Sequence, residues 1–223
     1  MRQLLNTTSV RYPVCIFDWD GTLVNSEKHI VESLSYAAER MNLPKLAYAE
    51  LKDIIGLSMH KALAMLYPGL SDADIEGMRR HYGEHFFSVP QDTSTLFAHV
   101  LETLTRLQDA GVRLAVATGK SRHGLDKALV STGLKAFFEI ERCADETRSK
   151  PDPQMLLEIA AHFELPASAM LMIGDTEYDL EMAKRFGMDS LGVSYGVHDR
   201  ERLLRHEPVA IIDCFSELLK YAI

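Results

Sequence analysis

Two aspartates at the end of an apolar run are the residues of this sequence whose spacing most clearly suggests chemistry. The run from Tyr12 to Phe17 is typical of a short buried strand, and Asp18 and Asp20 follow it. Side chains two residues apart in an extended segment point the same way, so these carboxylates are expected to converge. Close carboxylates repel unless a cation lies between them or one is protonated. The pair indicates a hard metal ion, or a division of labour between a nucleophile and a proton carrier; an ordinary Asp-Gly turn is the alternative.

A threonine ends a second apolar run, Val112–Ala117. The hydroxyl of Thr118 and the backbone N–H groups that follow it are suited to bind phosphate oxygens where the chain turns into a helix. An ordinary helix N-terminus has the same appearance and is the alternative. The segment from Thr118 to Ser121 also resembles the end of a P-loop, but Leu114 stands where that motif requires glycine, so we exclude a nucleotide cradle.

A lysine and a second acidic pair complete the polar groups. Lys150 precedes Pro151, which disfavours a helix there, and a stiff approach would hold the ammonium near a bound phosphate. Asp175 follows another apolar run and offers the hard oxygen ligands that magnesium prefers, and Asp179 lies one helical turn later on the same side. The alternatives are a solvated loop lysine and a helix cap, because Thr176-x-x-Asp179 matches a capping box.

The elements that must position these residues alternate between strands and helices. We expect strands at 12–17, 112–117, 137–140, 170–173, 190–193 and 209–212, and helices at 95–110, 122–132, 153–163, 176–186 and 199–206. This alternation predicts an α/β fold, a Rossmann-like parallel sheet with helices on both faces. Ligands bind at the carboxyl ends of the strands in such folds, which is where Asp18, Thr118 and Asp175 fall.

Residues 25–89 interrupt this alternation with helical patterns alone. Helices are expected at about 25–41, 47–55, 59–67 and 72–88, the first of them with a clear apolar stripe. We therefore predict an α/β core domain formed by residues 1–24 and 90–223, with an all-α domain, residues 25–89, inserted after the first strand. Its junctions, near Val24 and near Val89-Pro90, would act as a hinge.

Composition narrows the classes of partner. The chain has 223 residues, 47% of them hydrophobic, a net charge of −8 and no long basic cluster, so nucleic acid is not an expected partner. No stretch is apolar enough to span a membrane, and no signal peptide begins the chain. The three cysteines, Cys15, Cys143 and Cys214, are widely spaced, which favours reduced thiols and a cytoplasmic location.

The order of these groups resembles the haloacid dehalogenase superfamily of phosphotransferases. The segment Asp18-Trp19-Asp20-Gly21-Thr22 is similar to its first motif, Thr118 to its second, Lys150 to its third, and Gly174-Asp175-Thr176 with Asp179 to its fourth. The insertion between the first two motifs resembles the helical cap of that superfamily. Among its members, the chain looks most like phosphoglycolate phosphatase.

The resemblance implies a role for each matching residue. Asp18 would attack phosphorus and form an aspartyl-phosphate, and Asp20 would protonate the leaving oxygen and then take a proton from water. Mg²⁺ would be held by the Asp18 carboxylate, the main-chain carbonyl of Asp20 and Asp175, with Asp179 adjusting the site. The groups expected to hold the phosphate oxygens are the Thr118 hydroxyl, the Gly119 N–H and Lys150.

Two residues near the first motif depart from the pattern of the family. Asn25 stands where relatives often have aspartate, and Trp19, bulkier than the usual residue, is expected to pack away from the phosphate. The run from Gly56 to Lys61 breaks the helical pattern and is expected to descend over the site. Its His60 and Lys61 are candidates for recognising a carboxylate or sugar, with solvated residues at a helix start as the alternative.

Two weaker signals remain. His81 and His85 are four apart, as metal ligands on one helix face can be, but a solvated helix face is the better interpretation. Tyr195 and Gly196 follow the fifth expected strand and are expected to border the pocket.

The sequence thus predicts a magnesium-dependent phosphatase that acts on a small phosphorylated metabolite, with phosphoglycolate as the leading substrate, in a monomer or homodimer. The first alternative is a phosphomutase similar to β-phosphoglucomutase, which differs in whether water is kept from the aspartyl-phosphate. The second is a phospho-receiver module, which also uses an aspartate, a threonine and a lysine, but in another order and without a large helical insertion.

Overall fold

A six-stranded parallel sheet forms the centre of the computed structural model, which describes residues 10–88 and 95–223. The strand order is β3-β2-β1-β4-β5-β6, and each strand pairs with its neighbours in parallel. The strands are β1 (Val14–Phe17), β2 (Arg113–Thr118), β3 (Ile140–Cys143), β4 (Met170–Gly174), β5 (Asp189–Val193) and β6 (Ala210–Ile212). The predicted α/β class with a Rossmann-like sheet is confirmed.

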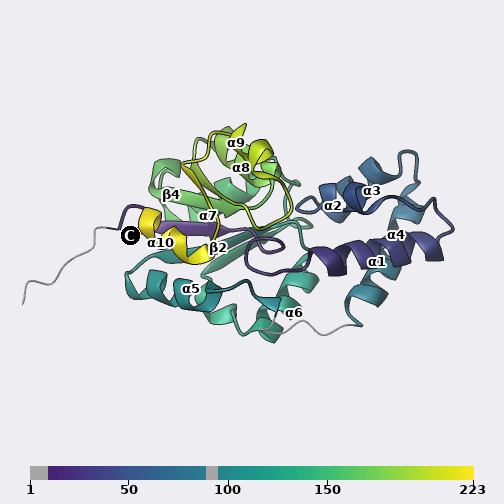
Figure 1. Cartoon of the computed structure of the whole chain (residues 1–223), viewed down its shortest axis with the longest axis horizontal. Coiled ribbons are helices and arrows are strands. Elements are labelled where there is room, and N and C mark those ends of the chain that lie inside the picture. Colours follow the sequence, from purple (N-terminus) through teal and green to yellow (C-terminus); the bar gives the residue numbers. More distant parts are fainter. Residues whose placement is uncertain (1–9, 89–94) are drawn as a thin grey trace, which may run out of the picture.

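Helices cover both faces of the sheet, because the central strand is apolar on both sides. In β1, Cys15 and Phe17 face one apolar cluster, whereas Val14 and Ile16 face another. Figure 1 shows the two helical layers above and below the sheet. The first cluster is closed by α5 (Val100–Asp109), α6 (Arg122–Thr132), η4 (Phe215–Leu218) and α10 (Leu219–Ala222), the second by α7 (Gln154–Phe163) and α8 (Glu177–Phe186).

The segment between β1 and α5 is helical and forms an apolar cluster of its own at one end of the molecule, on the right of Figure 1. Its helices are α1 (Glu27–Arg40), α2 (Tyr48–Asp53), α3 (Met59–Leu66) and α4 (Asp72–Phe86). Tyr178 and Val197, from the part of the chain that carries the sheet, join this cluster. The division at residues 25–89 stays a prediction, and its second junction, Val89-Pro90, lies outside the described residues.

Most expected elements differ from the structure by at most two residues at an end, and two differ by more. The helix expected at 95–110 begins only at Val100, because His99 before it adopts a left-handed conformation (φ 67°) that no helix interior allows. The strand expected at 137–140 begins at Ile140. Before it, the short 3₁₀ helix η2 (Lys135–Phe137) turns the chain, and the apolar Phe138 packs its ring against Phe17 and Trp19.

The remaining short elements are η3 (Ala167–Ala169), which precedes β4, and α9 (Arg200–Leu204), which packs against α8 and β6. Within residues 10–88 and 95–223, no helix has the length and apolar character needed to cross a membrane.

Candidate active site

The predicted polar residues meet because β1 lies between β2 and β4. Phe17, the last residue of β1, is in register with Val116 on one side and Ile173 on the other. Asp18 then donates its backbone N–H to the Ile173 carbonyl at 2.9 Å, so it leaves the sheet at the same edge as Thr118 and Asp175. The predicted meeting of these residues at one edge of the sheet is therefore confirmed.

Lys150 is a buried cation between two carboxylates. Its Nζ lies 2.8 Å from Asp18 Oδ1 and 2.6 Å from Asp179 Oδ1, and its side chain has no exposed surface. Burial acts to lower the pKa of Lys150, but the charges of Asp179 and Asp18 outweigh it and the pKa is raised. The alternative of a solvated loop lysine is wrong.

A third buried carboxylate, that of Asp175, lies beside the two that contact Lys150. Asp18, Asp175 and Asp179 each place one oxygen within 4.8 Å of the others. Burial raises the pKa of Asp18 well above its ordinary value; Lys150 opposes this shift, and the charges of Asp179 and Asp175 add to it. Burial also raises the pKa of Asp175 to about 7, with Asp179 adding to the shift. One ammonium does not balance three carboxylates at neutral pH, so further positive charge or protons are required here.

The chemistry of this cluster fits a divalent cation. Within the described residues, Asp18 Oδ2 is buried and has no hydrogen-bond partner. An unpaired carboxylate oxygen is costly to bury, and beside two further carboxylates it is a natural ligand for a hard ion. The residues present therefore fit the predicted metal.

Asp175 and Asp179 are held in place by other parts of the chain. Asp175 accepts hydrogen bonds from the Thr22 hydroxyl at 2.8 Å and from the Val197 N–H at 2.9 Å. Asp179 Oδ2 accepts from the backbone N–H of Thr176 at 3.1 Å and from its hydroxyl at 2.7 Å. The capping interpretation of Asp179 is confirmed, while its other oxygen faces Lys150.

Two glycines leave the space that Asp175 occupies. Gly21 has a left-handed φ of +81°, and a Cβ there would lie 2.1 Å from Asp175 Oδ2. A Cβ on Gly196 would lie 2.2 Å from Asp175 Cβ. Tyr195, beside it, donates its hydroxyl to the Thr22 carbonyl at 3.1 Å. Tyr195 and Gly196 thus border the acidic cluster, but neither of them lines the cavity described below, where the sequence predicts them.

Asp20 does not join the acidic cluster through its side chain. Its Oδ1 accepts the Ser26 hydroxyl at 2.6 Å, and its Oδ2 lies 3.0 Å from Lys120 Nζ. Lys120 therefore balances the Asp20 side chain apart from the acidic cluster, which agrees with the interpretation that the two aspartates divide their labour. A contribution of the Asp20 carbonyl to a metal site stays a prediction. Sequence reasoning missed Lys120, although it stands next to the predicted Thr118-Gly119 pair.

The loop from Gly56 to Ser58 lies against the carboxyl edge of the sheet, as predicted. A Cβ on Gly119 would lie 2.6 Å from the Gly56 carbonyl oxygen and 2.7 Å from that of Leu57, so only glycine allows this approach. Ser58 donates its N–H to Ser149 Oγ at 2.9 Å, next to Lys150. The helical segment therefore contacts both loops that carry expected phosphate ligands.

His60 and Lys61 do not line the cavity below this loop. His60 is 68% exposed and lies 3.9 Å from Asp72 on the surface. Lys61 donates its ammonium to the Lys150 carbonyl at 3.1 Å, which ties α3 to that loop. The solvated alternative therefore describes His60, and a role of either residue in substrate recognition stays a prediction.

The remaining sequence signals are local. His81 contacts Glu84, and His85 lies 2.9 Å from Ser33 Oγ, so the two histidines share no site. Trp19 is buried in the main apolar cluster, as predicted, and points away from the acidic residues.

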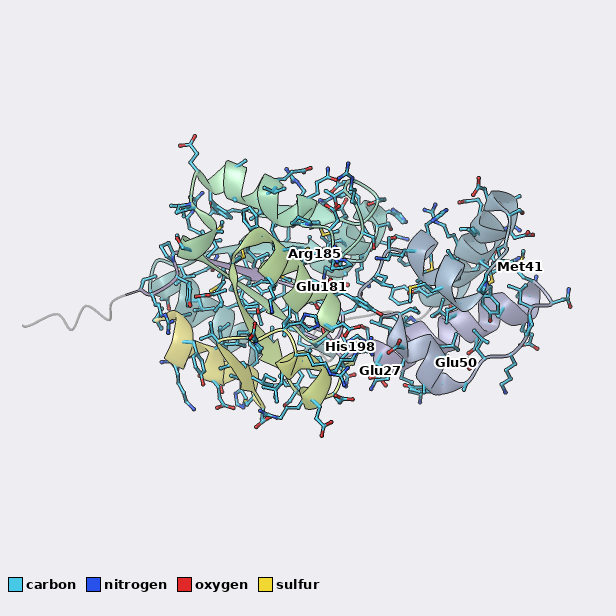
Figure 2. All side chains as sticks on the ribbon, turned by 90° about the horizontal axis from the view of Figure 1, so that it is seen from above. Glu27, Met41, Glu50, Glu181, Arg185 and His198 are labelled. Carbon is cyan, nitrogen blue, oxygen red and sulfur yellow. The ribbon has the colours of Figure 1, made fainter. Side chains whose placement is uncertain are left out.

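A second contact between the helical segment and the rest of the chain centres on His198, labelled in Figure 2. Its Nδ1 accepts the Glu177 N–H at 3.0 Å, so its Nε2, 3.3 Å from the Asp53 carbonyl, carries the proton. Burial, with a contribution from Arg202, lowers the pKa of His198, which agrees with a neutral ring. Tyr178 also donates to the Asp53 carbonyl, at 2.9 Å.

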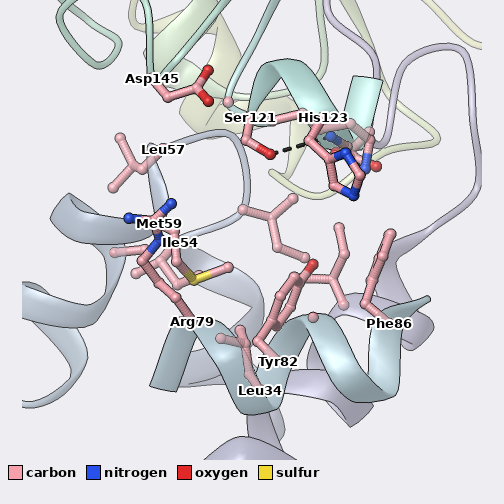
Figure 3. Close-up of a pocket in the computed structure, with 18 of the residues that line it drawn as sticks. Leu34, Ile54, Leu57, Met59, Arg79, Tyr82, Phe86, Ser121, His123 and Asp145 are labelled. Atoms are coloured by element: carbon pink, nitrogen blue, oxygen red, sulfur yellow. Dashed lines mark hydrogen bonds and ion pairs between the residues drawn. The ribbon is translucent and has the colours of Figure 1, made fainter. Parts of the chain in front are cut away.

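A cavity of about 450 Å³ separates the acidic edge of the sheet from α4. Asp18, Asp20 and Gly119 border it on one side, and Figure 3 shows Tyr82 reaching into it from α4. Burial, with the charge of Asp20, raises the pKa of Tyr82 well above its ordinary value, so its hydroxyl stays protonated. Sequence reasoning missed Tyr82, because nothing local distinguishes it from other aromatic residues of the helix.

Comparisons with known proteins agree with this geometry. A protein of Dickeya dadantii (strain 3937) named "Probable phosphatase IndB" is 34% identical over 211 residues, which cover 93% of this chain and 92% of that protein. The phosphoglycolate phosphatase of Agrobacterium fabrum (strain C58 / ATCC 33970) is 29% identical over 211 residues, covering 92% and 90%. The crystal structure of a haloacid dehalogenase-like protein from Bacteroides fragilis superposes with a TM-score of 0.83 at 27% identity, over 93% of this chain and 99% of that one.

The sequence also matches the family of haloacid dehalogenase-like hydrolases over residues 15–193. The matched range begins at β1 and ends with β5, so it contains every member of the acidic cluster together with Lys150. The chain therefore belongs to the haloacid dehalogenase-like hydrolase family.

Proposed function

We propose that this protein is a magnesium-dependent phosphatase that cleaves a small phosphomonoester through an aspartyl-phosphate on Asp18. The observation that carries the proposal is the buried Oδ2 of Asp18, which lies beside Asp175, Asp179 and Lys150 and has no hydrogen-bond partner among residues 10–88 and 95–223. A nucleophile needs a free lone pair, and an anionic one attacking a phosphate needs nearby positive charge.

The proposed reaction has two steps. In the first, a carboxylate oxygen of Asp18 forms a bond to phosphorus while the bond to the ester oxygen breaks, and the protonated form of Asp20 gives its proton to the leaving alcohol. In the second, Asp20 takes a proton from water, whose oxygen attacks phosphorus and releases phosphate from Asp18. Asp20 is suited to this exchange because it borders the cavity and is oriented by Ser26 and Lys120.

Other groups of the chain hold the transferring oxygens. Lys150 supplies a fixed positive charge 2.8 Å from Asp18, and the Thr118 hydroxyl and the Gly119 N–H lie at the neighbouring strand end. Asp18, Asp175, Asp179 and the Asp20 carbonyl are the proposed Mg²⁺ ligands. When bound, Mg²⁺ supplies charge that shields the nucleophile from the phosphate and polarises the phosphoryl group.

The test is release of inorganic phosphate from a panel of phosphorylated metabolites, phosphoglycolate included, with Mg²⁺ and with a chelator. We expect turnover that requires the metal, and we expect Asp18→Asn to reduce it by at least about 1,000-fold. Acid-quenched protein should carry a phosphoryl group that alkali releases, and the variant should carry none. An Asp18→Asn variant that retains a tenth of the wild-type rate would refute the nucleophile assignment.

A second experiment distinguishes a phosphatase from a phosphomutase. With β-glucose 1-phosphate and a bisphosphate primer, conversion to glucose 6-phosphate without free phosphate would favour the mutase. For the compartment, we propose the cytoplasm, because the three cysteines are free thiols. Size-exclusion chromatography with light scattering decides between the proposed monomer and homodimer.

A further inference from the structure

The cavity beside Asp18 and Asp20 is larger than a two-carbon leaving group requires. Its volume of about 450 Å³ lies in the range of roughly 300–1,000 Å³ that is typical of sites for larger small molecules. This volume exists while Gly56 and Leu57 touch Gly119, so it is not produced by separation of the helical segment from the sheet. Phosphoglycolate bound through its phosphate would leave most of the space to water.

The walls beyond the acidic edge are largely apolar. The apolar side chains that line them come from α1, from the loop after α2, from α3 and from α4, and they include Ile30, Leu34, Ile54, Leu57, Met59 and Phe86. Charged groups on these walls are confined to Glu76, Arg79 and Arg80 of α4 among the lining residues of the helical segment. Figure 3 shows several of them facing one another across the space. Ligand pockets with apolar walls and a few polar groups at one end bind molecules of the same polarity pattern. The occupant should therefore carry a phosphate at one end and an apolar body at the other.

Gly83 indicates where that body lies. It stands within α4 with ordinary helical geometry, where glycine destabilises a helix relative to alanine. A Cβ at Gly83 would meet nothing nearer than a Phe87 ring carbon at 3.8 Å, an ordinary contact. Gly77 of the same helix differs, because its Cβ would lie 2.8 Å from Met41 Cε. Neither the backbone conformation nor the packing of the protein requires glycine at position 83. The absence of a side chain there leaves space at the wall of the cavity.

Aromatic side chains border this opening. Tyr82 and Phe86 stack with ring centroids 5.2 Å apart, and Phe87 meets Phe86 edge to face at 5.5 Å. All three line the cavity with Gly83 between them in the sequence. A flat ring gains more from such surroundings than a flexible chain, because it adds ring contacts and loses little conformational freedom.

On the basis of the phosphatase function above, we propose that the substrate is a phosphomonoester whose leaving group carries an aromatic or heteroaromatic ring. The ring lies against α4 in the space left by Gly83, and Gly83 sets the largest ring accepted. Phosphoglycolate lacks such a ring and is then a poor substrate.

A series of primary alkyl phosphates tests the proposal: ethyl, benzyl and naphthylmethyl phosphate, with phosphoglycolate alongside. The leaving alcohols of the three alkyl esters have similar acidity, so their kcat/KM values compare the fit of the apolar body. We expect kcat/KM to rise at least about tenfold from ethyl to benzyl phosphate, because the apolar surface of the ring is transferred from water to the apolar wall of the cavity. A benzyl ester no better than the ethyl ester would overturn the proposal.

Filling the space tests the assignment of Gly83. We expect Gly83→Leu to lower the benzyl-to-ethyl ratio of kcat/KM at least about tenfold, and Gly83→Ala to lower it less. Glu84→Leu is the matched control, because that position is exposed on the same helix, and its ratio should equal that of the wild type. Thermal unfolding shows that each variant is folded. A folded Gly83→Leu with the wild-type ratio would overturn the role of Gly83.

Binding measurements test the preference for a ring independently of the proposed hydrolysis. The phosphonate analogues of the same series are measured by calorimetry with Mg²⁺ and need no turnover. Tighter binding of the ring-bearing phosphonates, lost in Gly83→Leu, supports the inference even if no ester is hydrolysed, a result that would refute only the proposed phosphatase. Equal binding across the series would overturn the inference while leaving any observed hydrolysis intact.

Discussion

Replacing Lys150 with methionine removes the positive charge buried among the carboxylates while keeping a side chain of similar length. The ammonium lies 2.8 Å from Asp18 and 2.6 Å from Asp179, and none of these side chains is more than 1% exposed. At an effective dielectric constant of ~20, each contact contributes about 6 kcal/mol of gross attraction. The cost of burying the ammonium offsets much of this sum, and loss of one partner of a buried ion pair typically costs about 3–5 kcal/mol.

The loss of stability caused by Lys150→Met should depend on pH. The pKa values of Asp18 and Asp175 are already raised in the folded protein, and loss of Lys150 raises them further. Carboxyl groups with a raised folded pKa bind more protons in the folded state than in the unfolded one, so their contribution is favourable at low pH and disappears as pH rises through the folded pKa. The variant should therefore approach the wild type near pH 5 and differ most near pH 8.

The assay is urea unfolding of metal-free protein at several pH values. We expect Lys150→Met to lower the free energy of unfolding by about 3–5 kcal/mol at pH 8, and by clearly less at pH 5. Lys28→Met is the matched control, because Lys28 is 81% exposed and pairs with Glu32 only on the surface, so its effect should stay below about 1 kcal/mol. If Lys150→Met lowers the free energy of unfolding at pH 8 as little as the control does, or equally at both pH values, this account of the acidic cluster is refuted.

The remaining predictions concern the residues around the cluster. Because the folded pKa of Asp175 is about 7, the metal-free wild type should lose stability as pH rises from about 4 toward 7 and beyond. In urea titrations, Asp175→Asn should reduce this dependence of the free energy of unfolding on pH, and Mg²⁺ should restore the stability of the wild type at pH 8. Gly21→Ala, with a left-handed backbone and a contact of 2.1 Å to Asp175, should lose at least about 2 kcal/mol and most activity, measured by thermal unfolding and phosphate release. Ser26→Ala removes the 2.6 Å hydrogen bond to Asp20 and should lower kcat about tenfold with Mg²⁺ affinity unchanged; an unaltered kcat would contradict a role for Ser26 in orienting Asp20.

The identity of the strand-end residues could be predicted from the sequence because the relevant signals are local. Apolar runs ending at Phe17, Ala117 and Ile173 predict buried parallel strands, and the polar residue after each run must then lie at the same edge of the sheet. The capping box at Thr176 is equally local, and it gave the correct start of α8. The largest errors in element bounds occurred where one residue, such as His99 in a left-handed conformation, overrode the pattern.

The sequence by itself determined which acidic residues lie at the carboxyl edge of the sheet, since the strand ends follow from patterns within short segments and the strands of a parallel sheet end at the same edge. Only the tertiary structure decided the charge partners there: Lys150 reaches Asp18 across 132 residues of chain, and Lys120 neutralises Asp20. It also decided that Gly83, and neither His60 nor Lys61, borders the cavity. The physical reason is that such contacts depend on how separate segments pack, and spacing along the chain does not encode the distance between them.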